Sequence, residues 1–262
     1  MKTFIAFFDV LGFKEFIYNN EMDYAQRMFG NLIRDSQSAV SGEKYIKTNS
    51  GMIVPDMEHQ KVNCLHVSDS IVFWSKSDTE EDFLEMVKAC YSFYWRSLQT
   101  SFPLRGCLIH GEIDFKPFTI DNGNDSKFYN YSLFGKGLIE SYLKAESINY
   151  AGCYIDESAI KNVEDSTINN LIYEQKICLY KIPFKNGTFS YEHVFRPLKG
   201  EHNDVSFRNS ANGIKRLFTD HMKGKELPES VKLKMNNTID FLEYFREART
   251  DLKNTQETNE EQ

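Results

Sequence analysis

An almost wholly apolar run, FIAFFDVLGF at residues 4–13, carries a single acid, Asp9, to the point where Gly12 permits a tight turn. A buried strand reads as a continuous apolar run, so we expect Asp9 where the strand leaves the core. The pattern from Phe13 onward predicts a helix whose free N–H groups face back toward the acid. An acid at this place suits a metal-bound polyphosphate, and a buried strand with a capping aspartate is the alternative.

The composition favours one domain with an appendage. The 262 residues include 41% hydrophobic and 14% aromatic side chains, which is enough for a packed core. The formal net charge of -7 argues against a nonspecific nucleic-acid binder, since lysine and arginine carry such binding. We therefore expect no nucleic-acid partner, and an anionic nucleotide would need a bound cation or a local basic cluster.

Cysteine usage and hydropathy predict a cytoplasmic protein. The five cysteines are widely spaced, form no CxxC pair and read as reduced core residues. No apolar stretch approaches the roughly 18 residues that a membrane helix needs, and the N-terminus has no signal-peptide pattern. No Cys/His spacing of the zinc type occurs, so no zinc site is expected.

The order of apolar patterns predicts an α+β fold in which helices cover a sheet. Asp69 lies in the turn of a predicted hairpin, and on such a sheet it would lie beside Asp9. Gly106 and Gly111 indicate a bulge, or a backbone that a ligand approaches closely. The expected elements are a strand at 4–10, a helix at 21–40, a loop at 42–60, hairpin strands at 61–67 and 70–75, a helix from 79 to before Pro103, a strand at 104–113, a polar loop at 114–127, a helix within 133–146 and a strand at 152–155.

The pattern changes after residue 160. We expect strands at 171–183 and 188–196, followed by helices at 206–223 and 229–250. The chain is accordingly divided into a domain at 1–158, a C-terminal extension of strands and helices at 159–254, and a polar tail at 255–262.

Four segments, FFDVLGF, HVSDSIVFW, LRGCLIHGE and FGKGLIESYLKAES, resemble in order the signature elements of class III nucleotidyl cyclases. The resemblance covers roughly residues 4 to 155, and the Arg-Gly and Gly-led segments look most like those of bacterial Pycsar pyrimidine cyclases. It implies a ferredoxin-like palm with a βαββαβ core and a C-terminal α/β extension. It also implies a homodimer with composite active sites.

The resemblance assigns the metal-binding and phosphate-binding residues. It implies that Asp9 and Asp69 bind two Mg²⁺ or Mn²⁺ ions, with the Val10 carbonyl as a further ligand. Two such ions activate a ribose 3′-oxygen and neutralise a triphosphate. The N–H groups of Leu11, Gly12, Phe13 and Lys14 would then bind the β- and γ-phosphates.

Two positions depart from the purine-reading pattern of the family. Leu65 stands where adenylyl and guanylyl cyclases have a lysine or a glutamate, and Ser132 falls where the second purine-reading residue would be. Leucine has no donor or acceptor for a purine edge, so UTP or CTP is favoured as the nucleoside triphosphate substrate. The resemblance then implies cUMP or cCMP as an antiphage signal for a separate effector.

The helix after Gly135 lacks the Asn and Arg pair of the family. One alignment places Glu140 and Lys144 at these positions, and the other places Ile139 and Leu143 there. Lys144 retains a positive charge without the fork of an arginine, and a solvated helix lysine is the alternative. Arg105 is a candidate phosphate contact, or else it forms a salt bridge with Glu112 or another surface acid.

Two other readings compete with an active cyclase. A haloacid-dehalogenase type of phosphotransferase also begins with an apolar strand that ends in aspartate, but it needs a second acid where this chain has Leu11. A catalytically silent cyclase-like domain that binds a nucleotide or dimerises is favoured by the missing Asn and Arg. Retention of Asp9 and Asp69 favours the enzyme, because two adjacent acids are costly without a metal.

Overall fold

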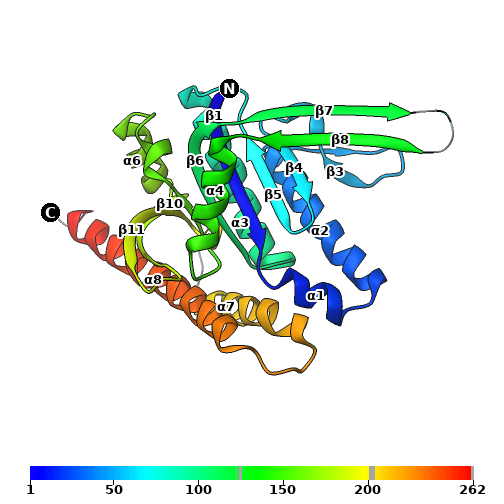
Figure 1. Cartoon of the computed structure of the whole chain (residues 1–262). Coiled ribbons are helices and arrows are strands. Elements are labelled where there is room, and N and C mark those ends of the chain that lie inside the picture. The colour runs from blue at the N-terminus through cyan, green and yellow to red at the C-terminus, as the bar shows by residue number, and fades with distance from the viewer. Residues whose placement is uncertain (122, 124–125, 201–203, 261–262) are drawn as a thin grey trace.

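A single seven-stranded sheet organises the molecule. In a computed structural model, residues 1–121, 123, 126–200 and 204–260 are described. The strand order is β10-β11-β9-β6-β1-β5-β4, with β1 near the middle (Figure 1). The strands are β1 (Lys2–Val10), β4 (Asn63–Val67), β5 (Ser70–Trp74), β6 (Leu104–Glu112), β9 (Cys153–Ile155), β10 (Ile177–Pro183) and β11 (Phe189–Phe195).

Four of these strands form a ferredoxin-like palm. Strand β1 lies between β6 and β5 and is antiparallel to both, while β4 pairs with β5 at the edge of the sheet. Helices α2 (Met22–Val40) and α3 (Glu80–Thr100) complete the chain order β1, α2, β4, β5, α3, β6. This order confirms the predicted α+β class with a βαββαβ core.

The two faces of β1 belong to two different cores. Phe4 and Phe8 pack with α2 and α3, whereas Ile5 and Phe7 pack with α4 (Lys136–Ser147) on the opposite face. All four side chains are buried, because helices cover both faces of the sheet at β1. This two-sided burial explains why the strand reads as a continuous apolar run rather than an alternating one.

Glycines let α4 lie close against the sheet. A Cβ atom at Gly137 would lie 2.6 Å from Ile5 Cδ1, and one at Gly111 would lie 2.8 Å from the Gly137 Cα. At Gly106 a Cβ would lie 2.7 Å from a ring atom of Phe8. The predicted bulge or ligand approach at Gly106 and Gly111 is therefore wrong: the register of β1 with β6 is unbroken, and the neighbours are a helix and a phenylalanine.

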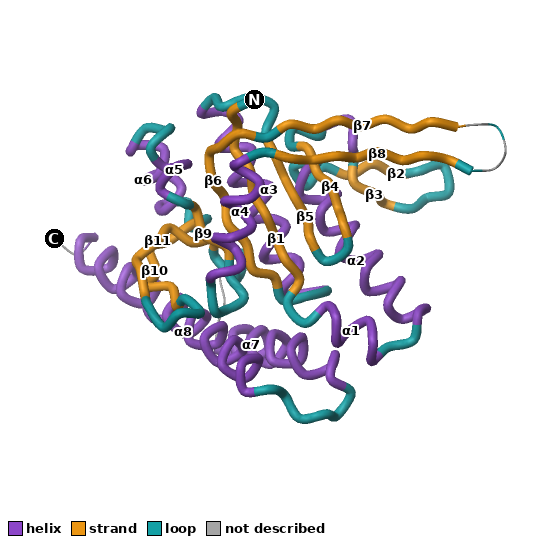
Figure 2. Tube along the Cα trace, in the orientation of Figure 1, coloured by secondary structure: helices purple, strands orange, loops and turns teal. Residues whose placement is uncertain are grey.

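Residues 114–121 form a strand, although the sequence predicted a polar loop there. Strand β7 (Asp114–Asp121) pairs with β8 (Lys127–Phe134) in a hairpin that projects from the body (Figure 2). Asp121 ends β7 and Gly123 follows it, and positions 122 and 124–125 of the predicted loop lie outside the described residues. Segment 42–60 likewise contains short elements, namely β2 (Tyr45–Lys47), β3 (Ile53–Pro55) and the 3₁₀ helix η1 (Met57–His59).

The C-terminal third continues the same sheet and then packs beneath it. Strand β11 pairs with β9, so β10 and β11 extend the sheet of the palm. Residues 171–173 end a helix instead of beginning the predicted strand. The remaining elements are α1 (Phe13–Asn19), α5 (Glu157–Ile160), α6 (Asp165–Tyr173), α7 (Asp204–Thr219), the 3₁₀ helix η2 (Asp220–Met222) and α8 (Glu229–Glu260).

Helix α8 is tied to the palm by side-chain contacts. The Thr238 hydroxyl accepts a hydrogen bond of 2.8 Å from the Ala151 N–H, and Phe241 is buried against Tyr150. The division of the chain at residue 158 stays a prediction, and of the predicted polar tail, residues 261–262 lie outside the described residues. Across the described part of the chain, every helix is too short or too polar to cross a bilayer.

Candidate active site

Asp9 and Arg105 face each other across neighbouring strands. They are register partners on β1 and β6, and Arg105 Nε and Nη2 each lie 2.7 Å from Asp9 Oδ2. Arg105 Nη1 also donates a hydrogen bond of 3.1 Å to the Glu146 carbonyl oxygen. The predicted salt bridge of Arg105 with Glu112 or another surface acid is wrong, because its partner is the largely buried Asp9, and Glu112 lies opposite Lys2 at the far end of β6.

Asp69 lies on the other flank of Asp9. It occupies the turn between β4 and β5, where Ser68 adopts a left-handed conformation with φ of 56°. The Val10 N–H donates a hydrogen bond of 3.0 Å to the Asp69 carbonyl oxygen, and Asp9 is the register partner of Ser70. Two acids that are far apart in the sequence therefore lie together at one end of the strands β1 and β5, and this row of strand ends is the edge of the sheet that forms the site.

The environment of Asp9 disfavours an isolated negative charge. Its side chain is 16% exposed and that of Arg105 is 12% exposed. Burial raises the pKa of the Asp9 carboxyl above its ordinary value, Arg105 opposes this rise, and the Asp69 carboxylate adds to it. A cation shared by both carboxylates would relieve the repulsion between them.

The turn after Asp9 has the geometry that the sequence predicts. Gly12 has φ of +77°, which favours glycine, and α1 begins at Phe13. The first helical hydrogen bond runs from the Phe16 N–H to the Gly12 carbonyl oxygen at 2.9 Å, so preceding helical N–H groups have no acceptor within the helix. The Leu11 N–H instead donates to the Pro103 carbonyl oxygen at 2.9 Å, so Leu11 offers no free N–H here.

A cavity of about 390 Å³ opens beside Asp9. Val10, Leu11 and Gly12 line it from β1 and the following turn, and Leu217 and Phe218 line it from α7. Its other lining residues are Asp9, Glu15, Arg105, Lys185, Met222, Pro228, Ser230, Val231 and Lys234. Asp69 lies at the neighbouring turn and outside this lining. Sequence reasoning missed Lys185 and Lys234, because a lysine in a turn and one on a long helix carry no local signal.

The donors at this edge fit a metal that arrives with a phosphorylated substrate. Among the described residues, no group of three or more His, Cys, Asp or Glu side chains is placed to hold a metal ion. Asp9, Asp69 and the Val10 carbonyl are oxygen donors, and Mg²⁺ is commonly bound by one or two carboxylates together with substrate phosphates. The residues therefore fit a metal that is completed by substrate oxygens, and their role as ligands stays a prediction.

Leu65 on β4 lies against one face of the β7–β8 hairpin, whereas Ser132 on β8 points from the other face. Leu65 lines an apolar hollow of about 340 Å³ together with Phe7 and Val72 from the sheet. Tyr131 and Leu133 on β8 also line it. Side chains alternate along a strand, so Ser132 faces away from the hollow, and its hydroxyl donates to Asn130 Oδ1 at 2.6 Å. The structure therefore does not bring Leu65 and Ser132 together within one chain.

Lys144 is engaged by another acid. It forms an ion pair with Asp156, the residue that caps α5. Burial lowers the pKa of Lys144, but the hydrogen bond and charge of Asp156 outweigh burial, so the pKa is raised overall. The structure thus assigns Lys144 a partner away from Asp9, while Ile139 and Leu143 on the same helix are 59% and 55% exposed.

The chain resembles solved structures of nucleotide cyclases, whereas no protein-family model and no curated protein matches it. One solved structure that matches is the catalytic core of a rhodopsin-guanylyl cyclase with converted specificity in complex with ATPalphaS (10% identity, TM-score 0.49, 74% of this chain and 95% of that chain). Another is an adenylate cyclase from Trypanosoma brucei in its monomeric state (9% identity, TM-score 0.46, 77% of this chain and 91% of that chain).

A class III adenylyl cyclase-like ATP-binding protein from Pseudomonas aeruginosa also matches (12% identity, TM-score 0.40, 65% of this chain and 36% of that chain). Since every one of these TM-scores is below 0.5, the fold is defined by the strand order given above and not by these similarities.

Proposed function

We propose that the protein is a metal-dependent nucleotidyl cyclase. It would convert a ribonucleoside triphosphate to a 3′,5′-cyclic nucleotide and diphosphate, with the catalytic unit in residues 1–158. The single observation that carries the proposal is the meeting of Asp9 and Asp69 at one edge of a ferredoxin-like palm, beside Arg105 and the Gly12 turn. The four cyclase-like segments of the sequence provide these same residues.

Each residue at this edge has a role in the proposed reaction. Asp9, Asp69 and the Val10 carbonyl would hold two Mg²⁺ or Mn²⁺ ions, which supply activation of the 3′-hydroxyl and neutralisation of the triphosphate. The ribose 3′-oxygen forms a bond to the α-phosphorus, the bond from the α-phosphorus to the diphosphate oxygen breaks, and the hydroxyl proton passes to solvent. Arg105 and the N–H groups of Gly12, Phe13 and Lys14 would hold the phosphates in line.

The base is proposed to be a pyrimidine. Leu65 lines an apolar hollow and offers no hydrogen bond to a purine edge, which supports UTP or CTP as the substrate. Ser132 remains the second proposed base-reading position. The products would be cUMP or cCMP, and a role as an antiphage signal rests on the sequence resemblance alone.

The enzyme is proposed to act as a homodimer. Apolar side chains on α4 and on the β4–β5 hairpin reach the surface, with Val67 58%, Ile139 59% and Leu143 55% exposed. Exposed apolar side chains that gather in one patch mark a surface that binds another protein. Joining two palms through this face would complete each site with residues of the other copy.

One observation favours a silent cyclase-like domain as the second candidate. The α4 helix lacks the Asn and Arg pair, and the charge that replaces it, Lys144, is paired with Asp156. Such a domain would bind a nucleotide without cyclising it. Turnover measurements separate the two candidates.

Incubation of the purified protein with each of the four ribonucleoside triphosphates and Mn²⁺, followed by mass analysis of the products, tests the proposal. The expected products are diphosphate and a cyclic pyrimidine nucleotide, with no product from Asp69→Asn. Formation of cAMP alone would overturn the pyrimidine assignment. A folded protein that yields no cyclic product from any triphosphate would support the silent domain instead.

A further inference from the structure

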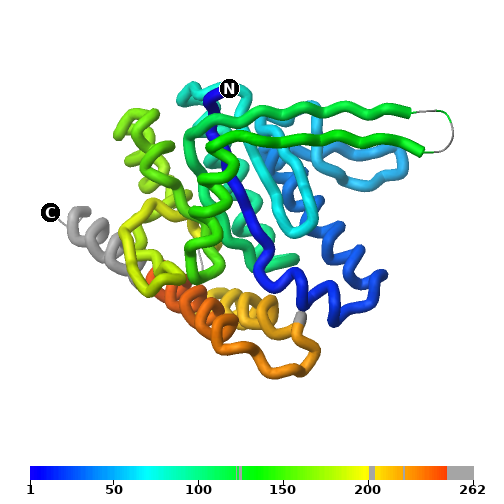
Figure 3. The backbone as a smooth tube through the Cα atoms, viewed as in Figure 1, coloured from blue at the N-terminus to red at the C-terminus, as the bar shows by residue number. Residues whose placement is uncertain are grey.

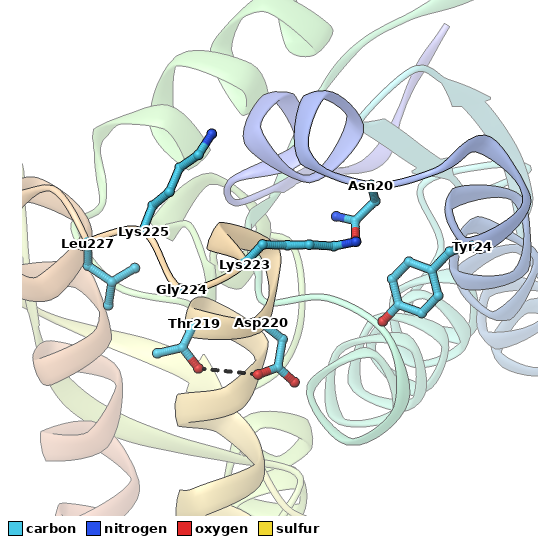
Figure 4. A pocket seen from close by; sticks show the side chains of 8 residues that line it. All are labelled: Asn20, Tyr24, Thr219, Asp220, Lys223, Gly224, Lys225 and Leu227. Atoms are coloured by element: carbon cyan, nitrogen blue, oxygen red, sulfur yellow. Dashed lines mark hydrogen bonds between the residues drawn. The ribbon is translucent and has the colours of Figure 1, made fainter.

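The C-terminal extension forms one wall of the cavity beside Asp9. The 3₁₀ helix η2 contacts α1, and in Figure 3 the orange connection from η2 to α8 lies next to the blue α1 at the end of β1. Lys225 Nζ donates a hydrogen bond of 2.7 Å to Asn19 Oδ1, which holds the two segments together. An open groove lies at this junction, where Tyr24 approaches from the palm and Lys223 from the extension (Figure 4).

Three cationic side chains from three separate elements converge on the cavity. Arg105 comes from β6, Lys185 from the turn between β10 and β11, and Lys234 from α8. Two carboxylates, Asp9 and Glu15, are the acidic side chains among the described lining residues. The three cations and two carboxylates of this lining sum to a formal charge of +1, whereas the whole chain has a formal net charge of -7.

The surroundings of Lys234 disfavour the charged form of its side chain. Among the described residues, its ammonium group makes a long polar contact of 3.4 Å to the Ser230 carbonyl oxygen. Burial lowers the pKa of Lys234, and the neighbouring charges of Lys185 and Arg105 lower it further. Lys232 on the same helix differs, because its Nζ lies 3.0 Å from Glu226 Oε1 and 2.8 Å from Glu229 Oε1.

The other two cations are held in place by acids and still face the cavity. Lys185 Nζ lies 3.0 Å from Glu146 Oε1, and Arg105 binds both Asp9 and the Glu146 carbonyl oxygen. Gathering like charges costs stability in the absence of a ligand, and such costs are found where a site binds an opposite charge. A negatively charged ligand fits Lys234, the one of these three cations that has no acid partner among the described residues.

We propose that Lys185 and Lys234 bind the terminal phosphates of the triphosphate, so that the C-terminal extension completes the substrate site of its own chain. This inference rests on the proposed function for the identity of the ligand. The lysines would act as point charges, while the N–H groups of Arg105 that do not face Asp9 or Glu146 would orient a phosphoryl group. The extension would then be a part of the phosphate site rather than only a support for the palm.

Calorimetric titration of the full chain with inorganic triphosphate in the presence of Mg²⁺ tests this inference without a nucleotide. Lys234→Gln and Lys185→Gln are each expected to weaken triphosphate binding by about tenfold, a typical loss for one charge-assisted contact. Lys232→Gln, on the same helix, is the matched control and is expected to bind within about twofold of the unchanged protein. The melting temperature of ligand-free Lys234→Gln should equal or exceed that of the unchanged protein, because a repulsive charge is removed.

Three outcomes would overturn the inference. They are equal effects of Lys234→Gln and Lys232→Gln, affinity for triphosphate no greater than for sulfate, and unfolding of Lys234→Gln, which would reveal a structural role. The failure of the proposed function is distinguishable. Specific triphosphate binding without any cyclic product would reject the cyclase and keep this site, whereas turnover with an unchanged KM in Lys234→Gln would reject this site and keep the cyclase.

Discussion

Asp9 Oδ2 accepts contacts of 2.7 Å from both Nε and Nη2 of Arg105, across the register-paired strands β1 and β6. This contact leaves the second oxygen of Asp9 outside the guanidinium fork. The same carboxyl group is thus placed to hold Arg105 on one side and a shared cation with Asp69 on the other. Arg105 consequently has both a structural and a functional role.

Substitution of Arg105 is expected to lower stability as well as activity. Arg105→Met leaves the Asp9 carboxylate mostly buried without its partner, which costs about 3 kcal/mol for a pair of this kind. Urea unfolding measures the loss. The double variant Asp9→Asn, Arg105→Met should recover much of it, because the unpaired carboxylate is gone. Wild-type stability of the single variant would contradict this assignment.

The close seat of α4 predicts that two glycine substitutions have opposite signs. Gly137→Ala places a Cβ 2.6 Å from Ile5 Cδ1 and 2.9 Å from the Glu112 nitrogen, so overpacking should destabilise the protein by about 2 kcal/mol. Gly30→Ala in α2 has no neighbour within 4 Å of its new Cβ and should stabilise by roughly 0.5–1 kcal/mol. Thermal unfolding of both variants checks the prediction, and equal shifts would contradict it.

His66 predicts a loss of stability in acid. The His66 Nε2 lies 2.8 Å from the Ser36 Oγ on α2, and the imidazole ring packs on Phe29 of the same helix. Burial lowers the pKa of His66 below its ordinary value of 6.5. The unfolded chain therefore takes up a proton below pH 6.5 that the folded chain resists. Stability is present above this pH and falls as the pH falls, with a slope of at most about 1.4 kcal/mol per pH unit for one proton.

The His66→Gln variant isolates this proton. The unfolding free energy of wild type and variant, measured by urea at pH 7.5 and 5.5, should show a smaller acid loss in the variant. His193, whose pKa burial also lowers, is present in both proteins and cancels in the comparison. Identical acid losses would show that His66 titrates normally in the folded protein.

The exposed face of α4 predicts a dimer interface. Ile139→Arg adds a charge to this face and is expected to convert a dimer to a monomer and to abolish turnover, with little change in melting temperature. Light scattering with size-exclusion chromatography measures the mass. Ile172→Arg on α6, at a residue 39% exposed against 59% for Ile139, is the matched control and should stay dimeric. A monomeric wild type would contradict the prediction.

Local sequence patterns were sufficient to predict the palm and the proximity of Asp9 and Asp69. The apolar run before Asp9, the Gly12 turn and the β4–β5 hairpin each carry their signal within a few residues. The strand order then brings Asp9 next to the Asp69 turn, because β1 pairs with β5. Helical periodicity likewise located α2, α3 and α4.

The sequence was least informative where contacts are distant or turn residues misleading. The loop predicted at 114–127 is wrong over residues 114–121, because the Asp, Asn and Gly residues in the sequence of this segment indicated a turn and obscured the aromatic strand residues. The Arg105 partner depends on register, which pairs it with Asp9 and places Glu112 at the other end of the strand. Lys185 and Lys234 reach the cavity only through the packing of the C-terminal helices, which no local pattern records.

Manganese binding tests the central claim most directly. Electron paramagnetic resonance titration of Mn²⁺ in the presence of a non-hydrolysable UTP analogue should show two bound ions per chain in the wild type. Asp69→Asn should weaken binding at least about tenfold, the loss of one charged ligand, while it keeps its melting temperature, because the Asp69 backbone carbonyl still accepts the Val10 N–H. Unchanged Mn²⁺ binding by folded Asp69→Asn would contradict the account.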